Sequence, residues 1–355
     1  MFVALRDLRF ARGRFILIGA VVALITVLVG FLSGLTGGLA TQNISAVLAI
    51  PSDRLVFSAP TTDESVSFAD SAVTEDQATS WESVEGVSSV EPIGISQTRA
   101  EAGDARAAVA LFGVQPGFTD SSPSQDGRVV LSAPVARDLD VDTGDTVTIA
   151  GTSYTVEAVG GDAWYSHTPV IEMTLSDWQA YSAATGSPDA YATVLAVTGD
   201  ADWAAADAST TTISQTTLGS LTALSSFRSE IGSLLLMVAM LFGISGLVIG
   251  AFFTVWTMQR KGDIAVLKAL GASTSSLVRD ALGQALIVLL TGIGVGLGLV
   301  ALFGVLVGNA LPFMLNPLTT VLPGVIMIVL GLAGAAFALR SVTSADPLTA
   351  LGSNR

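Results

Sequence analysis

The chain has 355 residues, of which 50% are hydrophobic and 13% charged, and a formal net charge of −14 at pH 7. Soluble domains usually carry about 25% charged residues, so this composition indicates a membrane protein rather than a soluble enzyme. The absence of cysteine excludes disulfides, thiolate metal sites and cysteine nucleophiles, and a single histidine excludes a His-paired metal site within one chain. The negative charge argues against nucleic-acid binding, which needs a basic surface.

Four long apolar runs, each without Lys, Arg, Asp or Glu, stand out along the chain. Because a helix of about 20 apolar residues crosses the hydrocarbon layer, each run is long enough to span a membrane. The first could instead be a secretory signal cleaved near Ala40, but its apolar part is longer than signals usually have. We predict four transmembrane α-helices over 15–40, 231–258, 281–308 and 319–340.

The basic residues indicate the orientation of these helices. The long segment 41–230 holds six Lys and Arg and 26 Asp and Glu. The other polar parts of the chain, which are 1–14, 259–280 and the tail from Arg340, hold ten Lys and Arg and four Asp and Glu. Since Lys and Arg collect on the cytoplasmic side, both termini are predicted to be cytoplasmic and 41–230 to be outside. A short outer loop is expected at 309–318. The protein as a whole is expected in the cell membrane of a bacterium.

The segment 41–230 has the alternating apolar pattern of short strands interrupted by turn and helix signals. We therefore predict a large α/β extracytoplasmic domain inserted between helices 1 and 2. The expected strands are 54–59, 107–114, 128–132, 145–151, 152–160 and 192–198, with a hairpin at Gly151-Thr152. The expected helices are 75–85, 133–139 and 175–185, and 200–220 is expected to lead helically into the second span.

Two cytoplasmic segments have an amphipathic pattern. Residues 1–14 place Phe2, Leu5 and Leu8 on one stripe beside arginines, which predicts an interfacial helix or a plain positive-inside anchor. The loop 259–280 has a short helix whose apolar face suits either a partner's groove or the membrane surface. Its expected coupling residues are Arg260, Asp263, Ile264, Leu267, Lys268, Leu270 and Gly271, with Asp263 near the helix start, Gly271 ending the helix and Ser273 capping the next segment.

The block RKGDIAVLKALGA (260–272) resembles the loop signature of the MacB/FtsX-type permeases of ABC transporters, and ADPLTAL (345–351) resembles their C-terminal motif. The order of one helix, an outer domain and three helices is also similar to this family, although Asp263 stands where Glu is more frequent. The resemblance implies a homodimer bound to two copies of a separate ATPase that docks on 260–280. It also implies mechanotransmission, in which closure of the ATPase is passed to the outer domains and the outer-leaflet parts of the helices.

The chain carries no ATP-binding loop of its own. A Walker A loop needs Gly-Lys-Ser/Thr, and neither Lys261 nor Lys268, the two lysines of the chain, has that context. ATP is therefore expected to bind to the partner, with no cofactor intrinsic to this chain.

Glycines four residues apart, such as Gly292 and Gly296 or Gly294 and Gly298, are expected to allow close helix contacts.

Within the family, the short chain resembles heme-exporting permeases and exporters of lipids or lipoproteins. Glu230 and Met237 lie two helical turns apart, so a carboxylate and a thioether on one face could ligate heme iron. Alternatively, Glu230 marks the membrane boundary and the methionines fill packing gaps. The candidate substrate residues are Arg228, Glu230, Met237 and Met240, with Tyr165 and His167 as a weaker second site.

The sequence thus predicts a permease subunit that exports an amphipathic substrate from the membrane, with heme as the first candidate. A different possibility is a signalling permease that activates an extracellular cell-wall hydrolase, and an exporter of a lipid, lipoprotein or peptide is a third. An intramembrane enzyme is disfavoured because the spans lack ionisable residues.

Overall fold

The structure, a computed structural model, describes residues 12–60, 65–119, 121–259, 262, 266, 270–307 and 311–343. The chain divides into two compact units. Leu39–Gly232 forms the β-sheet unit, and Met1–Gly38 together with Ser233–Arg355 forms the helical unit. Most of the N-terminal segment 1–14, of the block 260–269 and of the tail lies outside the described residues.

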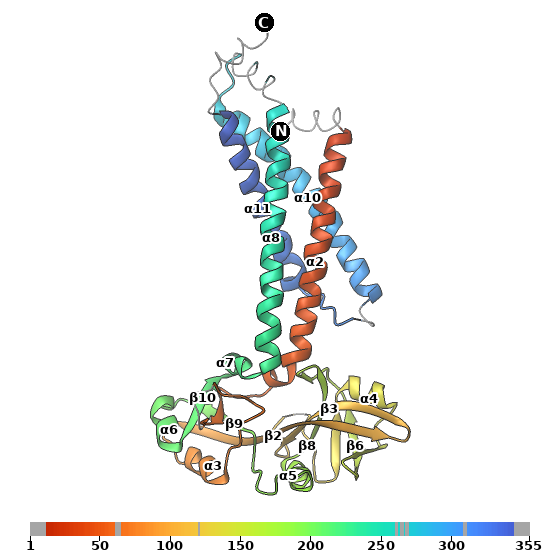
Figure 1. Cartoon of the computed structure of the whole chain (residues 1–355), viewed down its shortest axis with the longest axis vertical. Helices are drawn as coiled ribbons and strands as arrows, with labels where there is room; N and C mark the ends of the chain where they lie inside the picture. Colours follow the sequence, from red (N-terminus) through yellow and green to blue (C-terminus); the bar gives the residue numbers. More distant parts are fainter. Residues whose placement is uncertain are drawn as a thin grey trace. The chain divides into compact units, whose positions relative to one another are not determined.

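Four helices are long and apolar enough to cross a membrane, as the sequence predicts. They are α2 (Arg12–Leu48), α8 (Ser225–Gln259), α10 (Thr274–Val307) and α11 (Pro317–Thr343) (Figure 1). All four extend beyond the predicted spans at one end or both. Apolar runs report where a chain suits hydrocarbon, but a helix continues into polar sequence until a cap or a turn ends it.

Glycines let the helices of the helical unit approach one another closely. A Cβ at Gly292 would lie 2.9 Å from Val22 Cβ, and one at Gly296 would lie 2.5 Å from Thr26 Cβ. Both distances are too short for a real side chain, so these two glycines have the predicted packing role. A Cβ at Gly294 or Gly298 would meet nothing within 4 Å in this chain, so their predicted role in helix contacts stays a prediction.

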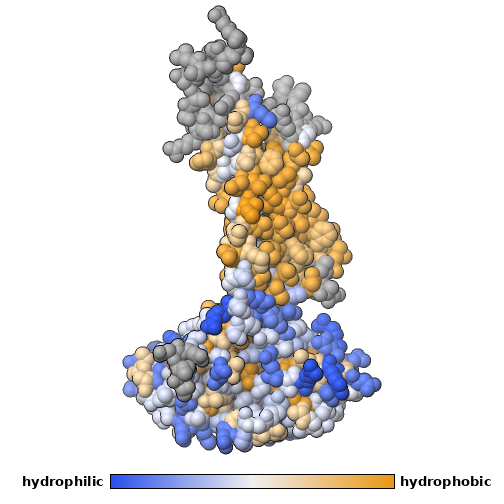
Figure 2. Space-filling model, in the orientation of Figure 1, coloured by the Kyte–Doolittle hydropathy of each residue, from blue (hydrophilic) through white to orange (hydrophobic). Residues whose placement is uncertain are grey.

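The face of the helical unit that Figure 2 shows is largely hydrophobic, as its orange surface indicates. Large exposed side chains on α8 include Leu235, Leu236 and Leu247, with exposed fractions of 57%, 62% and 73%. In water such a surface would be costly, whereas lipid tails solvate it without cost. The face of the β-sheet unit in the same view, by contrast, is mostly hydrophilic, with only scattered apolar residues.

The β-sheet unit is built on ten strands in the order β10-β1-β9-β2-β3-β8-β4-β6-β5, with β7 paired to β8. The longest strand, β2, pairs with β9 through its first half and with β3 through its second half. It also pairs with β5 at Ala100 and Glu101. The strands β2, β3, β8, β4, β6 and β5 therefore form a closed set, which we call the closed strands. The strands are β1 (Arg54–Ser58), β2 (Val87–Ala102), β3 (Ala105–Val114), β4 (Arg128–Leu131), β5 (Thr146–Ile149), β6 (Thr152–Val159), β7 (Trp164–Tyr165), β8 (Thr168–Thr174), β9 (Val194–Gly199) and β10 (Thr212–Thr216).

The short helices of this unit largely follow the sequence prediction. They are α3 (Glu75–Glu82), α4 (Ala133–Leu139), α5 (Leu175–Ala184), α6 (Trp203–Thr210) and α7 (Thr217–Ser220), followed by the 3-10 turn η1 (Leu221–Ala223). The expected hairpin is present, but its loop is Ala150-Gly151 rather than Gly151-Thr152, because Ile149 pairs with Thr152. Both loop residues have positive φ, as a two-residue type I′ turn requires.

The prediction that 200–220 leads helically into the second span is wrong. Strand β10 interrupts it and pairs antiparallel with β1 along five residues. The β-branched residues Thr212, Ile213 and Thr216 of this strand favour an extended chain, and pairing with β1 outweighs the helical tendency of the alanines before them. The strands β2, β7, β8 and β10 were not predicted.

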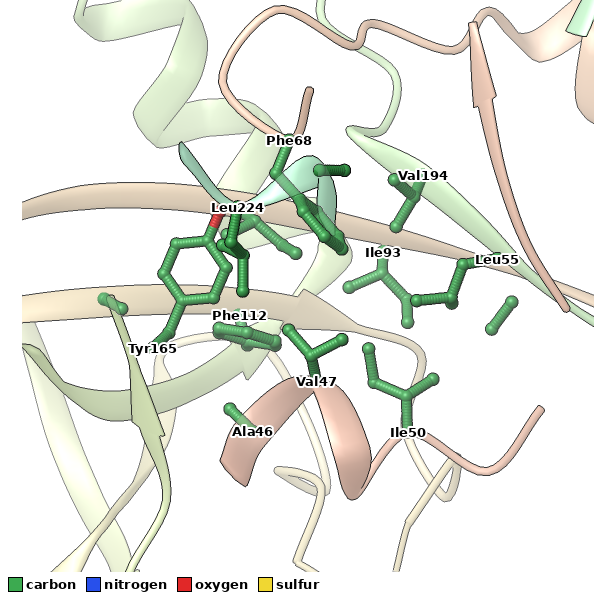
Figure 3. Packing of buried hydrophobic residues seen from close by; sticks show 14 of the residues in the cluster. Ala46, Val47, Ile50, Leu55, Phe68, Ile93, Phe112, Tyr165, Val194 and Leu224 are labelled. Carbon is green, nitrogen blue, oxygen red and sulfur yellow. The ribbon is translucent and has the colours of Figure 1, made fainter. Parts of the chain in front are cut away.

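The last turn of α2 and the residues just after it belong to the core of the β-sheet unit. Ala46, Val47 and Ile50 pack against sheet residues such as Leu55 and Ile93, as Figure 3 shows. Full burial of a large apolar side chain contributes about 1.5–3 kcal/mol, so these contacts favour continuation of α2 past its apolar run. A separate core lies inside the closed strands and includes Leu111, Ile171 and Met173.

Candidate functional site

A network of polar side chains lies in the β-sheet unit where the β7–β8 turn meets the end of α2 and the start of α8. The turn contributes Ser166 and His167, α2 contributes Asn43, and α8 contributes Ser226 and Glu230. Every one of these residues lies within Leu39–Gly232. We call these five residues the Asn43 network.

The turn itself has an uncommon backbone conformation. Tyr165 pairs with Thr168, so Ser166 and His167 form a two-residue loop, with φ values of 48° and 65°. Non-glycine residues adopt this left-handed region rarely and at a cost of about 1–3 kcal/mol each. Their N–H groups donate to the carbonyl oxygens of Asn43 and Gln42, both at 2.9 Å. These two hydrogen bonds hold the turn against α2 and help to offset the cost.

Glu230 is the common acceptor of the network. Its Oε2 lies 2.7 Å from His167 Nε2 and accepts a hydrogen bond from Asn43 Nδ2 at 3.2 Å. The 3.2 Å contact between Asn43 Nδ2 and His167 Nε2 follows from two donors converging on one oxygen. The pair of His167 with Glu230 is therefore oriented by a third side chain, which stabilises the carboxylate.

Asn43 is fully buried, and its hydrogen bonds extend the network in the other direction. Its Oδ1 accepts from Ser226 Oγ at 2.8 Å, and Ser226 Oγ lies 2.9 Å from Ser166 Oγ. A buried amide needs such partners, because leaving it unsatisfied costs about 1–3 kcal/mol. In contrast, the side chains of His167 and Glu230 are 34% and 35% exposed. The network thus combines a buried amide, that of Asn43, with an accessible imidazole–carboxylate pair.

That pair can coordinate a metal that a ligand brings with it, or form hydrogen bonds, but it does not by itself make a metal-ion site. Imidazole is a frequent axial ligand of heme iron, and a carboxylate can accept hydrogen bonds or bind a cation. Within the described residues, no group of three or more His, Asp or Glu could hold a metal ion. A single ligand that brings its own metal, or a cationic group, is what two such side chains can bind.

The structure regroups the predicted substrate residues. Glu230 and His167, treated as separate candidates in the sequence, lie in direct contact. Tyr165 does not join them: it is 6% exposed, and its ring packs edge-on against Phe68 and Phe112 (Figure 3). Burial raises the pKa of the Tyr165 hydroxyl well above its ordinary value. Tyr165 therefore belongs to the core and not to an accessible pair with His167.

The other three candidates are placed separately. Arg228 is in the β-sheet unit, where its Nη1 donates to Ser65 Oγ at 3.0 Å. Met237 and Met240 lie on α8 in the helical unit, with exposed fractions of 49% and 60%. Both side chains are therefore accessible in this chain, and the two alternatives for them, substrate ligand or packing, stay predictions.

The predicted coupling residues Arg260, Asp263, Ile264, Leu267 and Lys268 lie outside the described residues. Gly271 has a φ of 96°, in the left-handed region expected of a glycine that ends a helix. Leu270, just before it, is 79% exposed. Ser273 caps α10 as predicted, since its Oγ accepts from the N–H of Ser276 at 3.3 Å.

Asn43 and Ser226 were missed in the sequence. Both lie in polar stretches beside apolar runs, where one amide or hydroxyl does not differ from any other solvated residue. A hint was available in Asn43, which precedes the apolar residues Ile44, Ala46 and Val47 that continue the helix. A polar residue within a helix that still has an apolar face is a candidate for burial.

Two family models match the chain. The FtsX-like permease C-terminal model matches residues 230–347, and the MacB-like periplasmic core domain model matches residues 13–213, which is more than half of the chain. The chain belongs to the MacB/FtsX family of ABC-type permeases. The predicted family and fold class are thereby confirmed: four apolar helices, with a MacB-like domain between the first and the second.

Curated relatives of this permease match it from end to end. A protein of Staphylococcus haemolyticus described as "Putative hemin transport system permease protein HrtB" is 24% identical over 360 residues, which covers 99% of each chain. Proteins with the same description from two strains of Staphylococcus epidermidis are 24% and 23% identical, again over 99% of both chains.

Two solved structures show weaker likeness. The extracellular domain of the noncanonic ABC-type transporter YknZ from Gram-positive bacteria is 17% identical and covers 44% of this chain and 87% of its own, with a TM-score of 0.31. The periplasmic region of MacB from Actinobacillus actinomycetemcomitans is 11% identical and covers 48% and 92%, with a TM-score of 0.36.

Family membership makes this permease a multi-pass membrane protein with an extracytoplasmic β-sheet unit. It also indicates a transporter component rather than an enzyme, and it implies an ABC ATPase as partner.

Proposed function

We propose that this chain is the permease subunit of an exporter, which couples ATP hydrolysis by a separate ATPase to outward movement of an amphipathic molecule from the membrane. Heme is the first candidate for that molecule. The observation that carries this proposal is the end-to-end similarity to permeases described as hemin transport proteins. Similarity over 99% of both chains covers the helices as well as the β-sheet unit.

The Asn43 network supports heme as the substrate. Heme offers an iron that binds imidazole, carboxylate or thioether, and the partly exposed pair of Glu230 with His167 supplies two of these groups. Met237 follows Glu230 after seven residues of α8, or about two turns of helix, and its side chain is exposed. We propose Glu230 as the primary ligand, oriented by Asn43, with Met237 or His167 as the second.

The coupling scheme is part of the same proposal. The ATPase docks on 260–280, and two copies of this chain work with two copies of the ATPase. Both termini are cytoplasmic, and the stroke of the ATPase passes along the helices to the β-sheet unit. The substrate leaves from the membrane and not through a tunnel between the spans.

A hemin titration of the full-length chain in lipid nanodiscs tests the substrate. We expect a Soret band that shifts on binding, and Glu230→Gln and Met237→Ala should each weaken binding because each removes a candidate ligand. Met258→Ala is the matched control, since Met258 is also an exposed methionine of α8, with an exposed fraction of 53%. Absence of any hemin-dependent band, or an equal loss in Met258→Ala, would remove heme from the proposal.

The match to the FtsX-like model supports a second candidate, a signalling permease that activates a cell-wall hydrolase outside the cell. The two functions differ in what stimulates the ATPase. When the full-length chain is reconstituted with its ATPase, hemin should raise the hydrolysis rate of an exporter. If the hydrolysis rate does not change with hemin but rises when an extracellular hydrolase bound to this chain is added, signalling is favoured.

A further inference from the structure

A groove of about 450 Å³ lies on the surface of the helical unit between α2 and α10, and we call it the α2–α10 groove. Its lining includes Phe15, Ile16 and Gly19 of α2 and Ile287, Thr291 and Val295 of α10. None of the lining residues is charged, and Thr291 supplies the one hydroxyl. That hydroxyl donates to the carbonyl oxygen of Ile287 at 2.9 Å, so the lining suits an apolar occupant.

The groove has about the length of one leaflet of a bilayer. Its lining covers residues 15–23 of α2, which corresponds to a rise of about 12 Å at 1.5 Å per residue. The hydrocarbon of one leaflet is about 15 Å thick. Phe15 is also the first residue of the first apolar span, so the groove begins where the hydrocarbon begins. An acyl chain of a lipid therefore has a suitable length and polarity for it.

The two helices that form the groove run in the same direction. Gly292 of α10 lies against Val22 of α2, and Gly296, one turn later, lies against Thr26. The first turns of both helices are therefore at the same end of the groove, which is the end at Phe15.

That end of the groove is basic. Helix α2 begins at Arg12, so Arg12 and Arg14 belong to its first turn, directly before Phe15. The first two turns of α10 add Arg279 and Asp280. Three basic residues against one acidic residue favour an anionic group here, and basic residues between membrane helices are a usual feature of sites for anionic lipid headgroups.

An apolar groove with a cationic end is complementary to a molecule with an apolar chain and an anionic head. We propose that the α2–α10 groove binds an anionic phospholipid, with one acyl chain in the groove and the phosphate beside the first turn of α2. In the predicted topology this lipid belongs to the cytoplasmic leaflet. The proposal goes beyond the export function and does not depend on the identity of the exported molecule.

A second copy of the chain fits the groove less well than a lipid. In a dimer with its twofold axis normal to the membrane, equivalent residues of the two copies lie at the same depth. Two copies joined through this groove would bring Arg12 and Arg14 of both chains together, and like charges repel. A lipid phosphate neutralises these arginines instead.

Trp256 reports on occupancy of the groove. Its ring packs edge-on against that of Phe15, with the centroids 6.1 Å apart, and the other four tryptophans of the chain belong to the β-sheet unit. Brominated acyl chains quench tryptophan fluorescence only at short range. In nanodiscs that hold the full-length chain, brominated phosphatidylglycerol should quench Trp256 more than brominated phosphatidylcholine does at the same mole fraction. Trp256→Phe gives the background from the other four tryptophans.

Gly19→Leu should remove this preference by filling the groove. A Cβ at Gly19 would meet nothing within 4 Å, so the larger side chain enters the groove without first displacing a neighbour. The matched control is Gly243→Leu, because Gly243 of α8 is equally open but lies outside the groove. It should leave the preference unchanged.

Arg12→Gln tests the headgroup contact separately from the acyl chain. One arginine near an anionic membrane surface contributes about a fivefold change in affinity, so this variant should lower the preference for phosphatidylglycerol about fivefold. Equal quenching by the two lipids, an equal response of the two glycine variants, or an unchanged preference in Arg12→Gln would overturn the proposal. The experiment contains no hemin, so its failure is separate from a failure of the proposed export function.

Discussion

At the scale of single residues, Asn43 organises the candidate site. It is the one fully buried member of the network and joins Ser226 on one side to Glu230 on the other. The sequence could predict Glu230 and His167 as reactive side chains, since carboxylates and imidazoles are rare next to apolar runs. It could not predict their contact, which depends on a two-residue turn of non-glycine residues 63 positions away from Glu230.

Removal of the Asn43 side chain should destabilise the protein. Asn43→Ala removes the hydrogen bonds that the buried amide makes with Ser226 and Glu230, and the expected loss is about 1–3 kcal/mol of unfolding free energy. Thermal unfolding followed by circular dichroism measures it. Gln42→Ala is the control, because the neighbouring residue takes part through its backbone carbonyl, and its change should stay within about 0.5 kcal/mol. A similar effect of both substitutions would contradict the role of the amide.

Glu172 gives the β-sheet unit a pH dependence. Burial raises the pKa of its carboxyl above the ordinary 4.5, although hydrogen bonds from Ser121 and Thr119 act in the opposite direction. The folded state therefore binds this proton more tightly than the unfolded state, so the contribution to stability is lost as the pH rises through the folded pKa. Glu172→Gln should raise the melting temperature at neutral pH and change it little below pH 4.5.

Glu157 offers the opposite case for comparison. The N–H and hydroxyl of Ser124 lower the pKa of its carboxyl. Its stabilisation is present at neutral pH and is lost as the pH falls through the folded pKa, so Glu157→Gln should lower the melting temperature at neutral pH only. If both glutamine variants shift melting in the same direction at neutral pH, the assigned causes of the two pKa shifts are wrong.

At the scale of elements, the sequence predicted the helices and strands whose signals lie within one continuous segment of the chain. The positions of the four apolar helices and of the helices α3, α4 and α5 were expected, because their signals are continuous apolar runs or caps, although α2 continues eight residues past its predicted end. Strand β2 was not expected, since Val87–Ala102 contains Pro92, Gly94 and several polar residues. Its extended form comes from pairing with β9 and β3, partners that lie far away in the sequence or follow it.

Gly94 shows why this strand tolerates an apparent breaker. A Cβ at this position would lie 2.1 Å from the Trp178 ring, so only glycine lets α5 pack on β2. Gly94→Ala should cost about 1–3 kcal/mol by overpacking. Gly160→Ala is the control, because a Cβ there meets nothing within 4 Å and the backbone has no positive φ. Chemical denaturation of the full-length chain compares the two, and equal stabilities would contradict the packing role of Gly94.

At the scale of the whole molecule, the uneven distribution of charge predicts the topology. Six basic and 26 acidic residues lie in 41–230, whereas the basic residues dominate the other polar segments. Family membership supports an extracytoplasmic β-sheet unit, and the cytoplasmic location of both termini stays a prediction. Composition alone could predict this level of organisation because the bilayer restricts where charges can lie.

Single cysteines test this orientation without background, since the chain has none of its own. Asp104 lies in the turn between β2 and β3, and Leu270 follows the second span; both are exposed. In intact cells, a membrane-impermeant maleimide should label Asp104→Cys, and it should label Leu270→Cys only after permeabilisation. The reverse pattern would invert the topology and remove the basis for the proposed ATPase contact.

The contribution of α2 to the core of the β-sheet unit has a practical consequence for protein production. A soluble fragment designed to begin where the strands begin, at Arg54, would lack Asn43, Ala46, Val47 and Ile50. It would expose apolar sheet residues such as Leu55 and Ile93 to water and would be prone to aggregate. Fragments for crystallisation or antibody selection should therefore start no later than Leu39 and retain the first turns of α8 up to Gly232.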